Sequence, residues 1–150
     1  MQFKGLLIWL FTGALAAIGL AWLVAQIHLS GHAPVGLVSL GAGVLLGFVV
    51  SRLAANLGVG CRWRLTIGTA LLAILFVLAE HGWLYRDFRR QWQEARTTSA
   101  TVALLRPETP PSPAEYFAHE WNPGLWISDA VIIVGATLAV VLVLRRKNAF

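Results

Sequence analysis

Four long stretches without charged side chains constrain the fold of this chain more than any other feature. They are residues 5–27 and 33–51, with 23 and 19 residues, and residues 65–79 and 130–144, with 15 residues each. A helix that crosses the hydrocarbon core of a bilayer, about 30 Å thick, needs about 20 mostly apolar residues. The last two stretches reach that length only if Glu80 and Asp129 are included near their ends. The chain is therefore predicted to be an integral membrane protein.

The composition agrees with a single membrane domain over residues 1–150. Hydrophobic residues make up 57% of the chain and charged residues 13%, about half the charged share of a soluble domain. We predict an all-α four-helix bundle with spans at about 5–27, 34–55, 63–85 and 124–145, and one long extracytoplasmic loop, 86–123. A cleaved signal peptide is the alternative for the first span, but 23 apolar residues exceed the core of a signal peptide, about 7–15 residues.

The distribution of charge predicts how the helices cross the membrane. If the N-terminus is cytoplasmic, that side carries seven basic residues and no acid, for a net charge of +7. The opposite side then carries five basic residues and all seven acids, for a net charge of −2. Lys and Arg concentrate on the cytoplasmic side of membrane proteins. We therefore predict a multi-pass protein of the plasma (inner) membrane with both termini in the cytoplasm, and we read the basic composition as an orientation signal rather than a nucleic-acid site.

Trp9 and Trp22 lie near the two ends of the first span. Indole rings favour the interface between the hydrocarbon core and water. Both tryptophans are therefore predicted to anchor the first helix at the membrane surfaces.

The third helix is predicted to continue past its apolar stretch. Residues 84–96 contain no Gly or Pro, and Leu84, Phe88 and Trp92 are spaced four apart, which places them on one helical face. The helix then either extends outward from the membrane or bends and lies along the interface. Further along, Ser112 and Glu115 form a capping box, which predicts a short helix over about 113–121.

Small residues line one face of the second span. They are spaced four apart and are Ser39, Gly43, Gly47 and Ser51. Such a face lets two helix backbones approach closely in lipid. Two interpretations remain open: packing within the chain, or a seam with a second copy or another membrane subunit.

Residues able to bind metals gather at one predicted level, near the outer face. The set comprises His28, His32, His81, His119, Glu80, Glu120 and Asp129. Imidazole and carboxylate groups together suit zinc, copper, iron or nickel. The alternative is that these side chains simply face water, since no spacing matches a known metal motif. The lone Cys61 excludes an internal disulfide or a thiolate-rich site.

Glu80 and Asp129 are the sharpest candidates in this set. Each is expected about 7 Å inside the outer end of its span. An ionisable group at that depth faces a partner or a wet cavity and is a functional candidate by default. The two carboxylates are expected to share a proton or a cation. The alternative is structural: Glu80 pairs with His81 or Arg89, and Ser128 or Asp129 caps the fourth helix.

The sequence also resembles a family of small four-helix membrane proteins of planctomycete-type bacteria. The resemblance lies in Ala79-Glu-His81, Tyr85 and Asp87-Phe-Arg89, followed by a Pro-rich stretch and Trp126-Ile-Ser-Asp129. It implies that Glu80, His81 and Asp129 are features of the family. It implies no reaction and no cofactor.

The expected function follows from these patterns. No nucleophile–base pair, phosphate-binding loop or dinucleotide motif is present in the sequence, so we do not expect an enzyme. We predict a structural or accessory subunit of a membrane assembly. The alternative is an ion-binding or transport element that holds a proton or a metal ion at Glu80, His81 and Asp129, helped by His28 or His32.

Overall fold

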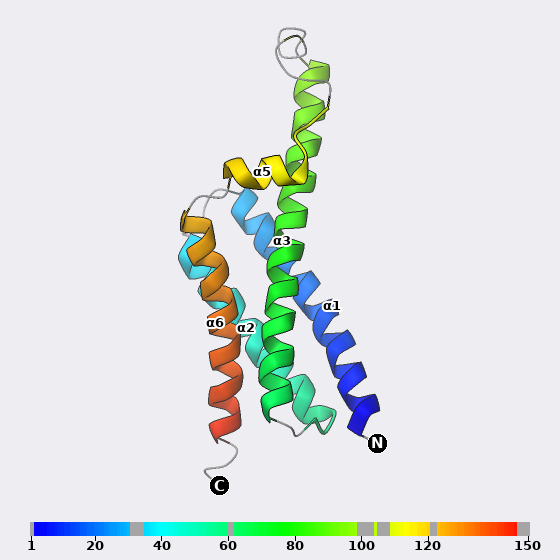
Figure 1. Cartoon of the computed structure of the whole chain (residues 1–150), viewed down its shortest axis with the longest axis vertical. Coiled ribbons are helices and arrows are strands. Elements are labelled where there is room, and N and C mark those ends of the chain that lie inside the picture. The colour runs from blue at the N-terminus through cyan, green and yellow to red at the C-terminus, as the bar shows by residue number, and fades with distance from the viewer. Residues whose placement is uncertain are drawn as a thin grey trace.

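The structure is a computed structural model that describes residues 2–30, 35–59, 62–98, 104, 109–120 and 123–146. These residues form an all-helical bundle (Figure 1). Its helices are α1 (Gln2–Leu29), α2 (Val35–Asn56), α3 (Arg62–Thr98), α5 (Pro113–Glu120) and α6 (Pro123–Arg146). Four of them, α1, α2, α3 and α6, are long and apolar enough to cross a membrane. The prediction of an all-α fold with four helices of spanning length is confirmed.

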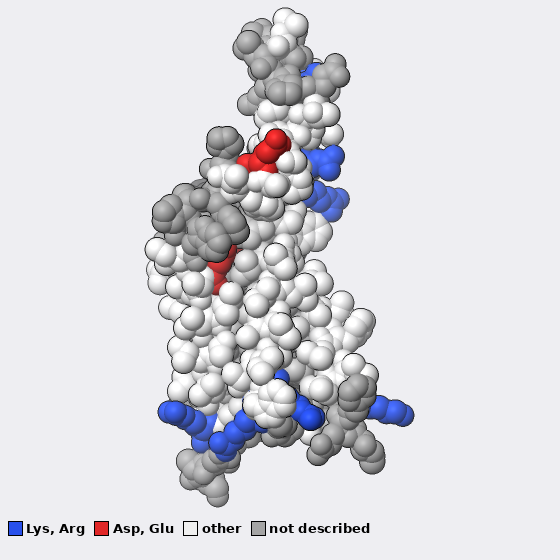
Figure 2. Space-filling model, in the orientation of Figure 1, with Lys and Arg blue, Asp and Glu red and all other residues white. Residues whose placement is uncertain are grey.

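The four long helices run side by side, with the start of α1 and the end of α6 at the same end of the bundle (Figure 1). That end carries the basic residues of the helix termini, drawn blue at the bottom of Figure 2. We call it the basic end, and its described side chains are Lys4, Arg52, Arg62, Arg64 and Arg145. The acids that Figure 2 shows lie toward the other end and on the part of the chain that projects beyond it.

Helix α3 is the longest element, with 37 residues. It continues past the other helices without a bend (Figure 1). After residue 85 the helix thus continues straight beyond the bundle, and its direction relative to a membrane stays a prediction. We call residues 86–98 of α3 the arm. The arm is polar and carries helical side-chain pairs: Arg90 Nε donates to Glu94 Oε1 at 2.7 Å, and Gln91 Nε2 donates to Asp87 Oδ2 at 2.6 Å.

Helix α5 lies crosswise at the base of the arm (Figure 1). It begins where the capping box predicts. The Ser112 N–H donates to Glu115 Oε2 at 2.8 Å, and the Glu115 N–H donates to Ser112 Oγ at 3.3 Å. Hydrogen bonds from the backbone N–H and the hydroxyl of Ser112 lower the pKa of the Glu115 carboxyl below its usual range.

The most extensive helix–helix contact joins α2 and α6. Its closest points lie on the small-residue face of α2. A Cβ at Gly43 would lie 2.5 Å from the Ile132 carbonyl oxygen, and one at Gly47 would overlap the Ala136 carbonyl oxygen. The two backbones are thus as close as glycine allows. The face is covered by α6 of the same chain, so in this arrangement it is not free to form a seam with a second copy.

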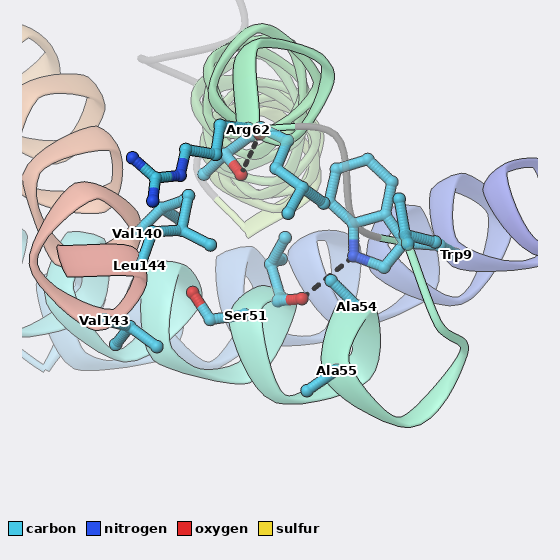
Figure 3. A pocket seen from close by; sticks show the side chains of 12 residues that line it. Trp9, Ser51, Ala54, Ala55, Arg62, Val140, Val143 and Leu144 are labelled. Atoms are coloured by element: carbon cyan, nitrogen blue, oxygen red, sulfur yellow. Dashed lines mark hydrogen bonds between the residues drawn. The ribbon is translucent and has the colours of Figure 1, made fainter. Parts of the chain in front are cut away.

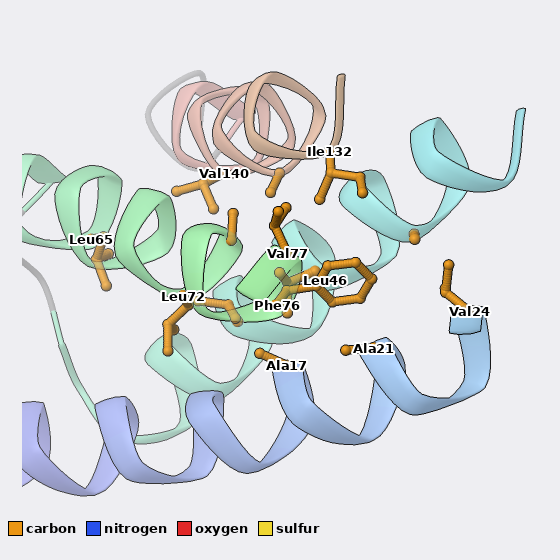
Figure 4. Packing of buried hydrophobic residues seen from close by; sticks show 14 of the residues in the cluster. Ala17, Ala21, Val24, Leu46, Leu65, Leu72, Phe76, Val77, Ile132 and Val140 are labelled. Atoms are coloured by element: carbon orange, nitrogen blue, oxygen red, sulfur yellow. The ribbon is translucent and has the colours of Figure 1, made fainter. Parts of the chain in front are cut away.

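Apolar side chains from all four long helices fill the centre of the bundle. Figure 4 shows Leu46 of α2 and Phe76 of α3 meeting there, with Ala17 and Ala21 of α1 pointing toward them. Small residues on α1 let the helices pack closely, while the large side chains fill the centre. The outward faces carry large exposed apolar residues, which suits an environment of lipid.

Trp9 does not behave as predicted. Its side chain is fully buried, and its Nε1 donates a hydrogen bond to the Val50 carbonyl oxygen at 2.9 Å. The indole also packs over Gly68, where a Cβ would lie 2.6 Å from the ring. The interfacial assignment of Trp9 is wrong because the indole N–H finds its partner on α2 instead of at the membrane surface. Trp22, by contrast, is 45% exposed.

Candidate functional site

His28 and Glu80 form an ion pair between α1 and α3. His28 Nδ1 and Glu80 Oε1 are 2.7 Å apart, and their side chains are only 12% and 6% exposed. His28 lies in the last turn of α1, and Glu80 projects from α3 into the bundle. A buried carboxylate is costly unless it is paired and hydrogen-bonded. The histidine supplies that pairing from a neighbouring helix.

His81 and Asp129 form a second pair, between α3 and α6. His81 Nε2 and Asp129 Oδ2 are 3.0 Å apart, and both side chains are largely buried. Glu80 and His81 are consecutive on α3, so their side chains diverge by about 100° around the helix axis. One points to α1 and the other to α6. A single turn of α3 therefore connects two other helices through ionisable groups.

Ser39 and Ser128 add a third link, a short hydrogen bond between their hydroxyl groups that joins α2 to α6. Both side chains are buried. Together the three contacts bring polar groups from all four long helices to one level of the bundle. We call this set the polar layer, and its members are His28, Ser39, Glu80, His81, Ser128 and Asp129.

The predicted candidates are thus brought together, but not in the pairing that was expected. Glu80 pairs with His28, not with His81 or Arg89. Each described carboxylate of the layer has its own histidine, so the two acids do not share one partner. The capping role expected for Ser128 or Asp129 is wrong, because α6 begins at Pro123, more than a turn earlier.

Part of the predicted set lies outside the described residues. His32 and the side chains of His119 and Glu120 fall in the part of the chain that the structure does not describe. Among the described residues, no group of three or more His, Cys, Asp and Glu side chains is arranged to hold a metal ion. A metal at this level stays a prediction.

Chemically, each pair can hold one proton between an imidazole and a carboxylate. Protonated histidine with ionised acid, and neutral histidine with neutral acid, have the same net charge and differ only in where the proton lies. His28 Nε2 is buried without a hydrogen-bond partner among the described residues, so it has no second group to share a proton with there. The pairs are therefore suited both to fastening helices and to holding protons.

An apolar groove lies next to the His81–Asp129 pair, between α3 and α5. Its volume is about 620 Å³, within the usual range for small-molecule sites. The groove is lined by Leu78, His81, Gly82 and Tyr85 of α3 and by Pro113, Ala114, Phe117 and Ala118 of α5. The Phe117 ring meets His81 edge-on, with centroids 5.5 Å apart.

Aromatic residues fix α5 against the base of the arm. Tyr85 donates its hydroxyl to the Pro111 carbonyl oxygen at 2.9 Å. Tyr116 lies over Phe88 with ring centroids 4.7 Å apart. The sequence pattern predicts that Phe88 and Trp92 share one helical face, but it does not predict the groove or the position of α5 over it. The available signal was the aromatic pair Tyr116-Phe117 directly after the capping box, opposite the aromatic face of α3.

A smaller cavity, of about 180 Å³, lies inside the bundle near the basic end (Figure 3). Trp9, Ser51 and Thr69 contribute to its walls, and Arg62 lies at its edge. Its hydroxyl groups are already used: Ser51 Oγ donates to the Gly47 carbonyl and Thr69 Oγ1 to the Leu65 carbonyl, each at 2.7 Å. The hydroxyl groups in its walls are therefore satisfied, and most of its other lining side chains are apolar.

Comparison with protein-family models, with curated proteins and with solved structures finds no match. The resemblance stated from the sequence stays a prediction.

Proposed function

We propose that this chain is a multi-pass protein of the plasma membrane that serves as a structural or accessory subunit of a membrane assembly. The observation that carries the proposal is the arm. Residues 86–98 continue α3 past the ends of the other three long helices and are braced at their base by α5 (Figure 1). A rigid polar helix that projects from an apolar bundle is suited to contact a partner outside the lipid.

We infer that both termini lie in the cytoplasm. The basic end supports this orientation, because cytoplasmic helix ends carry an excess of Lys and Arg. Reporter fusions test it. Alkaline phosphatase inserted at residue 109 is expected to be active, and a fluorescent protein fused to the C-terminus is expected to fluoresce. The reverse pattern would overturn the orientation.

The arm has the stiffness that a contact surface needs. Arg90 pairs with Glu94 and Asp87 accepts from Gln91, and both pairs are exposed along the helix. Each contributes little to stability at such an exposed surface. At the base, the contacts of Tyr85 with Pro111 and of Phe88 with Tyr116 hold the first turn of the arm in place. Binding to a pre-ordered helix costs less entropy than binding to a flexible loop.

Photo-crosslinking in native membranes tests the accessory role. A photoreactive residue replaces Gln93, which is exposed on the arm, and the control replaces Leu71, which is 58% exposed on the apolar part of α3. The expected result is a discrete crosslinked product of higher mass from position 93 and lipid adducts from position 71. If position 93 gives no protein adduct, the arm has no partner and the proposal fails.

In this role the polar layer fastens the bundle and carries no cargo. The Glu80→Gln variant keeps an acceptor for His28 and should leave the assembly intact. The variants Gly43→Leu and Gly47→Leu should break it, because they push α6 away from α2. Blue native electrophoresis of both sets of variants separates these outcomes.

A second candidate function is a proton-binding or transport element. The observation that favours it is the adjacency of two His–carboxylate pairs through Glu80 and His81 on one turn of α3. Ionisable groups within membrane segments often mark proton or ion paths. For this function the sensitivities reverse, and Glu80→Gln or Asp129→Asn should abolish proton movement in proteoliposomes with an internal pH dye. Asp87→Asn, on the arm, is the matched control.

The metal version of this second candidate has its own test. Elemental analysis of the protein purified in detergent should then find a stoichiometric transition metal. The His28→Ala and His81→Ala variants should lower the metal content, whereas a variant of the arm should not. A wild-type protein without stoichiometric metal removes this version and leaves the proton version standing.

A further inference from the structure

We propose that the groove between α3 and α5 binds one anionic phospholipid, with an acyl chain in the groove and the phosphate at Arg86 and Arg89. The site goes beyond the accessory role and requires that the bundle lie in a bilayer. It is carried by an apolar stripe on α3, an open position at Gly82 and two arginines directly beyond it.

The apolar stripe leads into the groove from the middle of α3. Leu71, Ile74 and Leu78 are 58%, 43% and 64% exposed. At 3.6 residues per turn, these three residues and Gly82 lie on one side of α3, within an arc of about 80°. The stripe therefore forms a continuous apolar track that ends beneath α5. An acyl chain lying on it would be covered at its upper end by Ala114 and Phe117.

Gly82 leaves open space in the wall of the groove. A Cβ built at this position would meet nothing within 4 Å. The helix loses stability through a glycine here, about 1 kcal/mol relative to alanine. The same lack of a side chain keeps the groove wide beside His81 and Tyr85.

Two exposed arginines follow Gly82 along α3. Arg86 and Arg89 follow Gly82 by four and seven residues, which places both on the Gly82 side of α3. Both are exposed, and the Arg86 guanidinium lies 5.3 Å from the centre of the Trp83 ring. Among the described residues, neither makes an ion pair, whereas the nearby Arg90 is paired with Glu94.

The described acids near this position are engaged in hydrogen bonds with other residues. Asp87 lies on the opposite face of α3 and accepts a hydrogen bond from Gln91. Glu115 accepts hydrogen bonds from Ser112 at the start of α5. Basic residues at a membrane surface attract anionic lipid headgroups. The two arginines therefore favour a phosphate with net negative headgroup charge over a zwitterionic one.

The geometry favours a lipid over a second transmembrane helix. Helix α5 lies crosswise at α3 (Figure 1) and forms one wall of the groove. A partner helix is about 10 Å wide and straight, so α5 blocks its course along this face. A flexible acyl chain can end under α5 while its headgroup passes beside it. From Leu78 to Arg89 the helix rises about 16 Å, which separates a buried chain from its headgroup.

Native mass spectrometry of the detergent-purified full chain tests the site. The probes are phosphatidylglycerol and phosphatidylcholine with identical acyl chains. The wild type should retain one phosphatidylglycerol in preference to phosphatidylcholine. Arg86→Gln and Arg89→Gln should each weaken phosphatidylglycerol binding about five-fold and together remove the preference. Gly82→Leu should weaken binding of both lipids, because its side chain would occupy space in the groove where an added Cβ meets nothing within 4 Å.

Matched controls exist elsewhere in the chain. The Arg64 guanidinium lies 5.8 Å from the centre of the Trp63 ring, an arrangement similar to that of Arg86 and Trp83, so Arg64→Gln controls for loss of charge. A Cβ added at Gly19 on α1 would also meet nothing within 4 Å, so Gly19→Leu controls for the glycine change. Equal retention of the two lipids by the wild type, or equal losses in variant and control, would overturn the site. If the reporter fusions still show that the protein is inserted in the membrane, such a result leaves the accessory role untouched.

Discussion

His28 Nδ1 and Glu80 Oε1 lie 2.7 Å apart, although the two residues belong to helices α1 and α3 and are far apart in the sequence. The pair fastens the end of α1 to α3 where both side chains are almost completely buried. Removing one member of a buried pair leaves the other member buried without its partner. The contribution of each residue to the stability of the bundle therefore depends on the other.

The first prediction uses this dependence. His28→Ala should destabilise the bundle by about 3–5 kcal/mol, because it leaves the Glu80 carboxylate buried without a partner. The double variant His28→Leu/Glu80→Leu should recover most of this loss, since two apolar side chains replace the pair. Thermal unfolding in detergent, followed by tryptophan fluorescence, measures both. Additive losses in the double variant would contradict the coupling.

The second prediction concerns the close contact of α2 with α6. Gly43→Ala should already destabilise the bundle, and Gly43→Leu more so, because the Cβ would lie 2.5 Å from the Ile132 carbonyl. Overpacking of this kind costs about 1–3 kcal/mol or more. Gly41, two residues earlier and facing open space, provides the control variant Gly41→Ala, which should be neutral or stabilising. Equal melting temperatures for Gly41→Ala and Gly43→Ala would show that the two backbones are not in contact.

Local sequence patterns were sufficient to predict the four long helices and the start of α5. Apolar length alone identifies the four long helices, and the Ser112–Glu115 capping box acts within four residues. The level of Glu80 and Asp129 also follows from counting residues along their helices. These features need no knowledge of which helices are neighbours.

The partners within the polar layer required that knowledge. Glu80 and His81 are adjacent in sequence, which suggested a pair, but consecutive residues on a helix do not face each other. The same limit explains Trp9, whose indole finds the Val50 carbonyl only once α1 and α2 are packed. It also explains the small-residue face of α2. The sequence shows small residues at Gly43 and Gly47, but only the arrangement of the helices shows that α6 covers them.

The third prediction concerns the attachment of α5 to the arm. Tyr85→Phe removes the hydrogen bond to the Pro111 carbonyl and should weaken this attachment by about 1 kcal/mol. Amide hydrogen exchange in α5 should then become several-fold faster, while exchange in α2 stays unchanged. Tyr85→Leu should have a larger effect, because it also removes the ring that contacts Tyr116 and Phe117. Unchanged exchange in both variants would mean that α5 is held elsewhere.

The fourth prediction is a pH dependence at the start of α5. The Ser112 N–H and hydroxyl stabilise the ionised Glu115 carboxyl and lower its pKa in the folded state. A group with a depressed pKa stabilises the fold above its unfolded pKa, and this contribution is lost as the pH falls through the folded pKa. Amide exchange in the first turn of α5, corrected for its intrinsic pH dependence, should therefore accelerate below the usual range for a glutamate. Glu115→Gln keeps a side-chain acceptor for Ser112 but does not titrate, so its corrected exchange should stay constant over the same range. An equal acceleration in the glutamine variant would assign the effect to another group.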